Sequence, residues 1–203
     1  MEGFYFDQSA CNGCKACAIA CKDKHDLPIG VQWRRVIEYT GGSWVQQGDT
    51  YEPKVFSYYT SISCNHCEDP ICAEVCPTTA MTIRDDGTVY VDPKKCIGCK
   101  YCAMACPYSA PQFNPEKGIM TKCDGCKDYR DAGQEPACVA ACPSRALEWG
   151  DVAELAKKHN SDVRSVEPLP DPEITRPNLV ITPHRDAQPP GQGTGEIANP
   201  EEI

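Results

Sequence analysis

The sequence predicts an α+β protein built of small sheets and short helices and held together by bound metal rather than by a large apolar core. Cysteine accounts for 16 of the 203 residues, and hydrophobic residues of all kinds for only 41%. Short alternating runs of apolar and polar residues separate clusters of cysteine, which is typical of short strands. A composition this rich in cysteine indicates a scaffold that side-chain packing alone does not stabilise.

The cysteines fall into four groups of four, with none left over. The first group is Cys11, Cys14, Cys17 and Cys21. The second is Cys64, Cys67, Cys72 and Cys76, and the third is Cys96, Cys99, Cys102 and Cys106. The fourth is Cys123, Cys126, Cys138 and Cys142. This pattern is an internal repeat with spacers of variable length.

Short strands are expected to lead into two of these groups. Residues 3–7 (GFYFD) precede the first group, and residues 89–92 (VYVD) precede the third. Residues 81–84 and 88–91 alternate around Asp85-Asp86-Gly87, which predicts a hairpin between the second and third groups.

Longer elements are predicted elsewhere. Residues 33–62 are rich in Val, Ile, Tyr and Trp, interrupted by Gly41-Gly42 and Gly48, and indicate a second β-excursion. Short helices are expected after the last cysteine of each group. Asp151 has the character of a helix N-cap, with Glu154 three residues on, and predicts a helix that ends near His159.

The C-terminal segment differs from the rest of the sequence. Eight prolines and three glycines occur among the 36 residues from Pro168 onward, which disfavours regular structure. One interpretation is a disordered tail. Residues 174–182 (ITRPNLVIT) are nevertheless too apolar for a solvated linker and favour an extended arm laid on a partner subunit.

Disulfides are a poor explanation for the cysteines. No basic-then-apolar export segment is found, so nothing in the sequence demands an oxidising compartment. Most neighbouring cysteines within a group are so close that a bridge would close a tiny ring and restrain little of the unfolded chain.

Charge and hydropathy exclude two further classes of function. The formal net charge of −9 disfavours nucleic acid as a partner, because a phosphate backbone requires a basic surface. No run of 18 apolar residues is present, so any membrane role is expected to come through a partner.

The spacing within the groups predicts iron–sulfur clusters. The first and third groups read C-x2-C-x2-C-x3-C, in which three thiolates wrap one cluster and the fourth binds the other cluster of a pair. The second and fourth groups widen the second gap to four and eleven residues and keep the final x3. Structural zinc favours separated C-x2-C pairs, whereas Cys11, Cys14 and Cys17 would place three ligands in one short loop.

Residues flanking the groups are expected to modify them. A proline follows the last cysteine of the second, third and fourth groups, but Lys22 takes that place in the first. Because each cluster with four thiolates carries negative charge, nearby cations are expected to raise its reduction potential. The candidates are Lys15, Lys22, Lys100, Lys122 and Lys127.

The histidines are expected to be secondary. His66, between Cys64 and Cys67, could be a ligand, a proton partner or a neighbour that binds no iron, and the complete cysteine set favours the last role. His25, His159 and His184 are expected to be solvated. No nucleophile, phosphate-binding or metalloprotease motif is present, so no catalytic residue is predicted.

The order of the four groups resembles the iron–sulfur (electron-transfer, beta) subunits of complex molybdenum oxidoreductases. Residues 61–70 (SISCNHCEDP), 96–107 (CIGCKYCAMACP) and 120–126 (MTKCDGC) look most like the subunit of anaerobic dimethyl sulfoxide reductase. The similarity covers nearly the whole sequence and includes residues 176–181 (RPNLVI).

This resemblance implies two ferredoxin-like, pseudo-symmetric modules with β-hairpin insertions and an extended C-terminal arm. Residues 1–30 with 112–160 would form one module that binds two [4Fe–4S] clusters. Residues 61–111 would form the other, with 31–60 as a β-rich insertion. Residues 161–203 would be the Pro/Gly-rich arm that docks on partner subunits.

The resemblance also implies the ligand sets of four [4Fe–4S] clusters. The cluster nearest the catalytic subunit would be held by Cys11, Cys14, Cys17 and Cys142. The next would be held by Cys123, Cys126, Cys138 and Cys21, and the third by Cys64, Cys67, Cys72 and Cys106. The cluster nearest the quinol would be held by Cys96, Cys99, Cys102 and Cys76. Nitrate reductase relatives have Trp at the position of Cys99 and a three-iron cluster there, so Cys99 implies four complete clusters.

In function, the resemblance implies a non-catalytic electron-transfer subunit used in anaerobic respiration. It would pass electrons from an integral membrane quinol-oxidising anchor subunit to a molybdopterin catalytic subunit, with no nucleic acid and no small-molecule substrate of its own. The complex would lie on the outer, periplasmic face of the cytoplasmic membrane by co-export with a twin-arginine partner, or alternatively on the cytoplasmic face.

Alternatives remain open at this stage. The terminal substrate could be a sulfoxide, an N-oxide, thiosulfate or polysulfide, because it never touches this subunit. A soluble polyferredoxin carrier would have no use for the β-excursion or the C-terminal arm. A structural metal-binding module would be colourless when purified.

Overall fold

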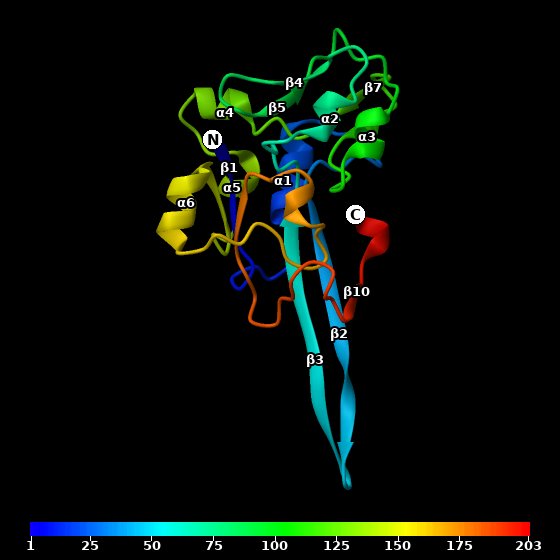
Figure 1. Ribbon diagram of the computed structural model, residues 1–203, viewed down its shortest axis with the longest axis vertical. Helices are drawn as coiled ribbons and strands as arrows, with labels where there is room; N and C mark the ends of the chain where they lie inside the picture. The colour runs from blue at the N-terminus through cyan, green and yellow to red at the C-terminus, as the bar shows by residue number, and fades with distance from the viewer.

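The computed structural model describes residues 1–203, and it has the mixed α and β content that the sequence predicts. Its strands form two three-stranded and two two-stranded sheets rather than one large sheet. Short helices and long connections fill the space between them, as Figure 1 shows. The fold is therefore α+β with small sheets.

The sheet next to the first cysteine group joins both ends of the sequence. Strand β1 (Glu2–Asp7) pairs antiparallel with β8 (Leu147–Asp151) and parallel with β9 (Leu179–Thr182). Because side chains alternate along a strand, Phe4 and Phe6 enter the main core while Tyr5 packs on the opposite face. The predicted strand before the first group is confirmed.

The β-excursion is a single long hairpin. Strands β2 (Arg35–Gln47) and β3 (Thr50–Ile62) pair from Arg35 opposite Ile62 to Gln47 opposite Thr50. Strand β10 (Gly195–Ile197) joins the outer edge of β2 near its middle. Gly41-Gly42 does not interrupt β2, and the turn falls at Gly48, whose φ is +62°.

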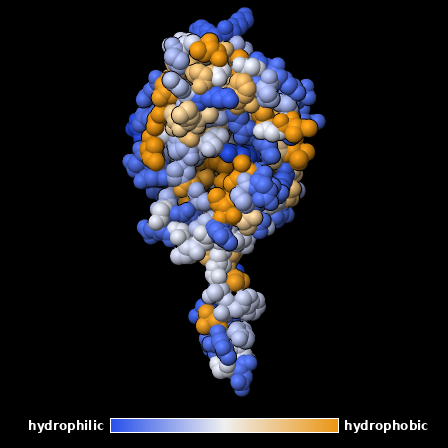
Figure 2. Space-filling view, turned by 90° about the vertical axis from the view of Figure 1, so that its right-hand side faces the viewer, coloured by the Kyte–Doolittle hydropathy of each residue, from blue (hydrophilic) through white to orange (hydrophobic).

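The distal half of this hairpin projects from the body as a narrow stalk (Figures 1 and 2). Trp44 lies opposite Pro53, and Tyr51 lies opposite Gln46, so these side chains share one face of the two-stranded ribbon. Trp44 and Tyr51 are both more than half exposed. This half therefore contributes nothing to the core.

Two short hairpins lie between the later cysteine groups. Strands β4 (Met81–Ile83) and β5 (Val89–Val91) pair antiparallel, which confirms the predicted hairpin. Strands β6 (Gln112–Asn114) and β7 (Ile119–Thr121) form a second hairpin that the sequence patterns did not indicate.

The helices lie within the cysteine groups, so their predicted position after the last cysteine was wrong. Helix α2 (Ile71–Glu74), α3 (Tyr101–Ala105) and α5 (Ala137–Ala140) end before the fourth cysteine of their groups. The proline after that cysteine disfavours helical backbone at the preceding residue. Helix α1 (Ala16–Lys24), where Lys22 replaces proline, continues through Cys21. Helix α4 (Lys127–Asp131) begins in the wide gap of the fourth group.

The helix after Asp151 is confirmed as α6 (Val152–His159). The Asp151 carboxylate accepts hydrogen bonds from the backbone N–H groups of Ala153 and Glu154, at 2.9 and 3.1 Å. These contacts satisfy donors that have no partner within the helix.

The C-terminal segment folds back on the body of the protein, which corrects the interpretation of an extended arm. Strand β9 lies beside β1, and Val180 and Ile181 are completely buried. Asn178 Nδ2 also donates to the His66 carbonyl at 2.6 Å. The edge of β1 and the core therefore cover the part of the apolar run from Leu179 to Ile181, whereas Ile174 is 48% exposed. Short 3₁₀ turns at Pro172–Ile174 and Pro200–Glu202 accommodate the prolines.

Cysteine is a principal component of the core. The largest apolar cluster contains 18 buried residues, among them Cys17, Cys64, Cys123, Cys138 and Cys142. None of the helices combines the length and the apolar character that a membrane span requires.

Candidate metal centres

All sixteen cysteines are free thiols, and most are buried or half-buried. Cys14 and Cys99, each the second cysteine of a C-x2-C-x2-C-x3-C group, are the exposed ones. The arrangement thus contains no disulfide framework.

One cavity lies where the first and fourth groups meet. Its lining includes the thiol-bearing residues Cys11, Cys14, Cys17 and Cys142. Phe6 and Val36 close its inner wall, and both are buried in the main core. Four thiols around one small hollow give the donor set of a [4Fe–4S] cluster.

A second cavity has the same character at the other end of the body. It is lined by Cys76, Cys96, Cys99 and Cys102. Met81 and Met120 complete the wall, and nearly all of the lining is apolar. The fourth thiol again comes from a different group, here the second.

The remaining eight cysteines gather into two further neighbourhoods. The pKa of Cys21 is raised to about 12, mainly by burial and also by the nearby Cys138 and Cys126 thiols. Burial likewise raises the pKa of Cys72 to about 12, with Cys64, Cys106 and Cys67 beside it. Cys123 lies near Cys21, Cys138 and also Cys64, so the two neighbourhoods adjoin. The structure therefore brings together the members of each predicted ligand set.

The first and third groups share a backbone conformation that turns the loop around its cavity. Gly13 and Gly98 precede the second cysteine with φ of +70° and +68°. Lys15 and Lys100 follow that cysteine with φ of +60° and +68°. A left-handed residue on each side of the second cysteine turns backbone N–H groups inward, which makes a concavity that favours an anion.

Backbone N–H groups also donate directly to cysteine sulfur. Ala146 donates to Cys142 Sγ at 3.3 Å, and Met81 donates to Cys76 Sγ at 3.4 Å. Met120 donates to Cys96 Sγ at 3.4 Å. Such bonds stabilise thiolate charge in an apolar surrounding, so the residues fit an anionic iron–sulfur cluster.

Three buried cations lie among the cysteines. Arg34, Arg35 and Lys122 are each no more than 7% exposed, and Lys122 Nζ donates to the Cys123 carbonyl at 2.8 Å. Of the lysines predicted to matter, Lys122 is the one that is buried. The sequence patterns missed Arg34 and Arg35, whose one signal is a pair of arginines placed directly before the apolar Val36 and Ile37.

His66 is completely buried and its ring is held by the protein. Its Nδ1 accepts a hydrogen bond from the Val89 backbone N–H at 3.1 Å, and its ring meets Trp149 edge-on. Burial lowers the pKa of His66 well below its usual value, and Lys122 lowers it further. The side chain is neutral, and this contact leaves the proton on Nε2.

The expectation that the other histidines are solvated was wrong. His25 packs on Trp33, and its Nε2 lies 3.5 Å from Cys126 Sγ. His159 stacks on Tyr5, with ring centroids 3.5 Å apart. His184 pairs with Asp186. Tyr58 also packs on the His184 ring. Tyr5 and Tyr58 are distant in the sequence from the histidines they cover, so local composition does not indicate these contacts.

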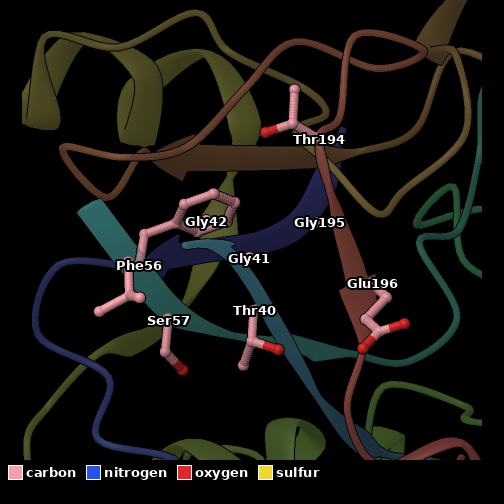
Figure 3. Close-up of a pocket in the computed structure, with 9 residues that line it drawn as sticks. Thr40, Gly41, Gly42, Phe56, Ser57, Thr194, Gly195 and Glu196 are labelled. Atoms are coloured by element: carbon pink, nitrogen blue, oxygen red, sulfur yellow. The ribbon is translucent and has the colours of Figure 1, made fainter. Parts of the chain in front are cut away.

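An open groove at the middle of the β2–β3 hairpin has a different character. Figure 3 shows Thr40, Gly41 and Gly42 of β2, the central strand, with residues of β3 and β10 on either side. None of its lining residues is a cysteine or a histidine. The groove is therefore a surface feature and not a metal centre.

Comparison with known proteins agrees with this donor chemistry. A family model described as "4Fe-4S dicluster domain" matches residues 55–152. The sequence is 54% identical over 201 residues to an anaerobic dimethyl sulfoxide reductase subunit of Escherichia coli (strain K12), covering 99% of this protein and 98% of that one.

More distant relatives are parts of other reductases. The sequence is 38% identical to a polysulfide reductase subunit of Wolinella succinogenes, covering 90% of this protein and 94% of that one. It is 40% identical to "Thiosulfate reductase electron transfer subunit PhsB" of Salmonella typhi, covering 73% and 74%. The protein carries [4Fe–4S] clusters, and its sixteen cysteines suffice for four. It belongs to the family of iron–sulfur electron-transfer subunits that serve dimethyl sulfoxide, polysulfide and thiosulfate reductases.

Proposed function

We propose that this protein relays electrons through four [4Fe–4S] clusters, from a quinol-oxidising membrane-anchor subunit to a molybdopterin catalytic subunit. The observation that carries the proposal is the gathering of sixteen thiols into four neighbourhoods of four, two of them around distinct cavities. The family relation to reductase subunits that are parts of larger complexes supports it.

The proposed ligand sets follow these neighbourhoods. The sets are Cys11, Cys14, Cys17 and Cys142; Cys123, Cys126, Cys138 and Cys21; Cys64, Cys67, Cys72 and Cys106; and Cys96, Cys99, Cys102 and Cys76. The proximity of Cys123 to Cys21 and Cys64 supports the order, because it makes the second and third sets neighbours. The exchange of fourth ligands between groups pairs the clusters within two ferredoxin-like modules. These are residues 1–30 with 112–160, and residues 61–111.

Exposure at the two ends supports entry and exit of electrons there. Cys99 is exposed, and the side chains around it include the solvent-facing Ile97 and Met104, at 66% and 81%. This apolar surface suits the membrane-anchor subunit. Cys14 is exposed at the other end, which suits the catalytic subunit.

Several properties of the assembly belong to the same proposal. The protein itself performs no substrate chemistry, since its cavities present thiols rather than a catalytic pair. Residues 161–203 pack partly on the body of the protein, and the side chains that they leave exposed dock on the partner subunits. The complex lies on the outer face of the cytoplasmic membrane.

The proposed terminal substrate is a sulfoxide such as dimethyl sulfoxide. The 54% identity to a dimethyl sulfoxide reductase subunit exceeds the 38% and 40% to polysulfide and thiosulfate reductase subunits, which favours this choice. Polysulfide and thiosulfate remain the alternatives that the test below separates.

The test begins with anaerobically purified protein and its co-purifying partners. We expect about sixteen iron and about sixteen sulfide per protein molecule, four of each per cluster. Zinc near four without sulfide would disprove the cluster assignment. Quinol-driven reduction should then be compared for dimethyl sulfoxide, an N-oxide, thiosulfate and polysulfide, and failure with all four would disprove the proposed relay.

A further inference from the structure

Arg34 is a buried cation held by neutral groups. Its side chain is 2% exposed. Nη1 donates to Ser61 Oγ at 3.0 Å, and Nη2 donates to Ser63 Oγ at 3.0 Å. The guanidinium lies over the Phe4 ring, 4.4 Å from its centroid, and Nε has no partner.

No carboxylate neutralises this guanidinium. Its oxygen hydrogen-bond acceptors are two hydroxyls and the Ser61 carbonyl, and the Cys138 thiol is a further neighbour. A buried charge without a counter-ion is expensive, and arginine does not lose its proton in proteins. The site therefore requires negative charge from another source.

Cysteines of two proposed ligand sets face Arg34. Burial alone would lower the pKa of Arg34, but Cys138, Cys17, Cys123 and Cys21 together raise it above its ordinary value. Cys17 Sγ lies 3.3 Å from the Ser61 hydroxyl that Arg34 also contacts. Cys138 is buried beside Arg34, whose guanidinium acts on it both as a charge and as a hydrogen-bond donor.

The cavity lined by Cys76, Cys96, Cys99 and Cys102 has no cation in its lining. The groups that act on the buried Cys102 are its own burial, the Ala103 backbone N–H and the thiols of Cys96, Cys76 and Cys99. Lys122 donates to the carbonyl of Val89 in the same core. Lys100 is exposed, with Nζ over the Phe113 ring at 4.4 Å. The other buried cations face the middle of the relay, since Arg35 faces Cys106 and Lys122 faces Cys72.

We propose that Arg34 is a fixed positive charge shared by the two clusters held through Cys17 and Cys138, and that it raises both reduction potentials. An added electron makes a cluster more negative, so a nearby guanidinium favours the reduced form. Because no cation is among the groups that act on Cys102, electrons run downhill from the cluster of Cys96, Cys99 and Cys102 toward Arg34. This inference rests on the proposed relay and supplies its direction. Arg34 is a positioning residue in this role, since it binds no iron.

A purely structural role explains less of the site. A neutral amide side chain could donate hydrogen bonds to the same hydroxyls and carbonyl, and it would avoid the cost of burying a charge. The part that requires arginine is the charge, and the charge faces thiols of two sets rather than one.

The test uses Arg34→Gln and Arg34→Lys in the purified holo-complex, with EPR-monitored redox titration as the readout. In Arg34→Gln, two of the four midpoint potentials should fall by about 59 mV, which corresponds to a tenfold change in the equilibrium constant for one electron. The other two should move by less than half as much. Arg34→Lys keeps the charge and loses the two-pronged hydrogen bonding, so its potentials should stay near those of the parent.

Two controls come from the same protein. Arg35→Gln changes the neighbouring buried arginine, which faces Cys106, and should lower a different potential. Arg185→Gln removes an arginine whose side chain is 87% exposed and should move none. Iron and sulfide content, measured on each variant, separates failure of this inference from failure of the proposed relay.

Every outcome decides the matter. Unshifted potentials in Arg34→Gln with full iron content would overturn the inference and leave the relay intact. Equal shifts in Arg34→Lys and Arg34→Gln would overturn it too, because hydrogen bonding and not charge would then set the potential. If Arg34→Gln loses the two clusters while Arg34→Lys retains them at parental potentials, the charge is required and the inference stands. Loss of those clusters in both variants would overturn it.

Discussion

The loops of the first and third cysteine groups have one spacing and one backbone conformation in two different surroundings. Each places a glycine of positive φ before its second cysteine and a left-handed lysine after it. In each, a helix begins directly after that lysine and carries the third cysteine. The second cysteine is exposed in both.

The surroundings of the two loops differ in packing and in charge. The first loop joins the 18-residue core that contains Phe4 and Phe6, and it lies near Arg34. The third joins a separate core of four buried residues. Apolar side chains reach solvent at both loops, Ile19 beside the first loop and Ile97 and Met104 beside the third. Cysteine spacing thus sets the shape of a ligand loop, whereas the residues packed around it set its stability, its charge and its accessibility.

Removal of iron should have the largest effect on the stability of the core around the first loop. Five of the 18 main-core residues are cysteines, so without clusters their thiols surround unfilled space. We expect chelation under reducing conditions to abolish the cooperative unfolding transition and the near-UV circular dichroism. An apo form that retains both signals would show that side-chain packing alone holds the core.

The helix at the first loop offers a more selective change. Lys22→Pro places proline inside α1 and removes the Lys22 Nζ hydrogen bonds to the carbonyls of Pro28 and Val31. We expect a loss of about 3 kcal/mol or more in the free energy of unfolding, as for proline within a helix. Denaturant titration of the holo-protein measures it.

The reciprocal change at the third loop is the matched control. Pro107→Lys alters a position beyond the end of α3, where Cys106 is already extended with ψ of 117°. Its cost should be about 0.4–1 kcal/mol, because it mainly increases the entropy of the unfolded state. Equal losses in the two variants would contradict the role of proline in ending these helices.

The sequence patterns indicated the local elements well. Alternation identified β1 and the β4–β5 hairpin, the spacing of cysteines indicated the groups, and Asp151 marked the start of α6. These features depend on neighbours a few residues away. The helices were misplaced because they were expected after the last cysteine of each group, although the x3 spacing to that cysteine corresponds to about one helical turn.

Contacts between distant segments could not be predicted in this way. Strand β9 reaches β1 across more than 170 residues, and its proline-rich flanks look like a tail. In the sequence, Arg34 and Arg35 look like two solvated arginines. In the structure they are buried, and the thiols that act on them come from the first, third and fourth cysteine groups. No local pattern carries that information.

A smaller change probes how β9 supports the first loop. Ile181 of β9 is completely buried against β1. Ile83 of β4 lies in the β4–β5 hairpin, which leads to the third loop, and is 51% exposed. Ile181→Val should cost about 0.5–1.5 kcal/mol. Ile83→Val should stay within about 0.5 kcal/mol. Comparable losses in the two variants, measured by denaturant titration, would mean that the surroundings of the two loops are equally well packed.

The smallest effect on the fold, and the sharpest on function, should come from the two exposed cysteines. In Cys99→Ser, three thiols remain at that site, from Cys96, Cys102 and Cys76, which suffices for a cluster that lacks one corner iron. We expect a new three-iron EPR signal in the oxidised protein and a change in unfolding free energy within about 0.5 kcal/mol, because the replaced side chain is exposed.

Cys14→Ser is the matched change at the other loop, where Cys11, Cys17 and Cys142 remain. If electrons enter beside Cys99 and leave beside Cys14, Cys99→Ser should block turnover with quinol and spare turnover with an artificial donor that enters beyond the altered site. Cys14→Ser should block both, because every electron passes that end before it reaches the catalytic subunit. The reverse pattern, with Cys14→Ser sparing the artificial donor and Cys99→Ser blocking it, would show that the two loops have been assigned to the wrong ends of the relay.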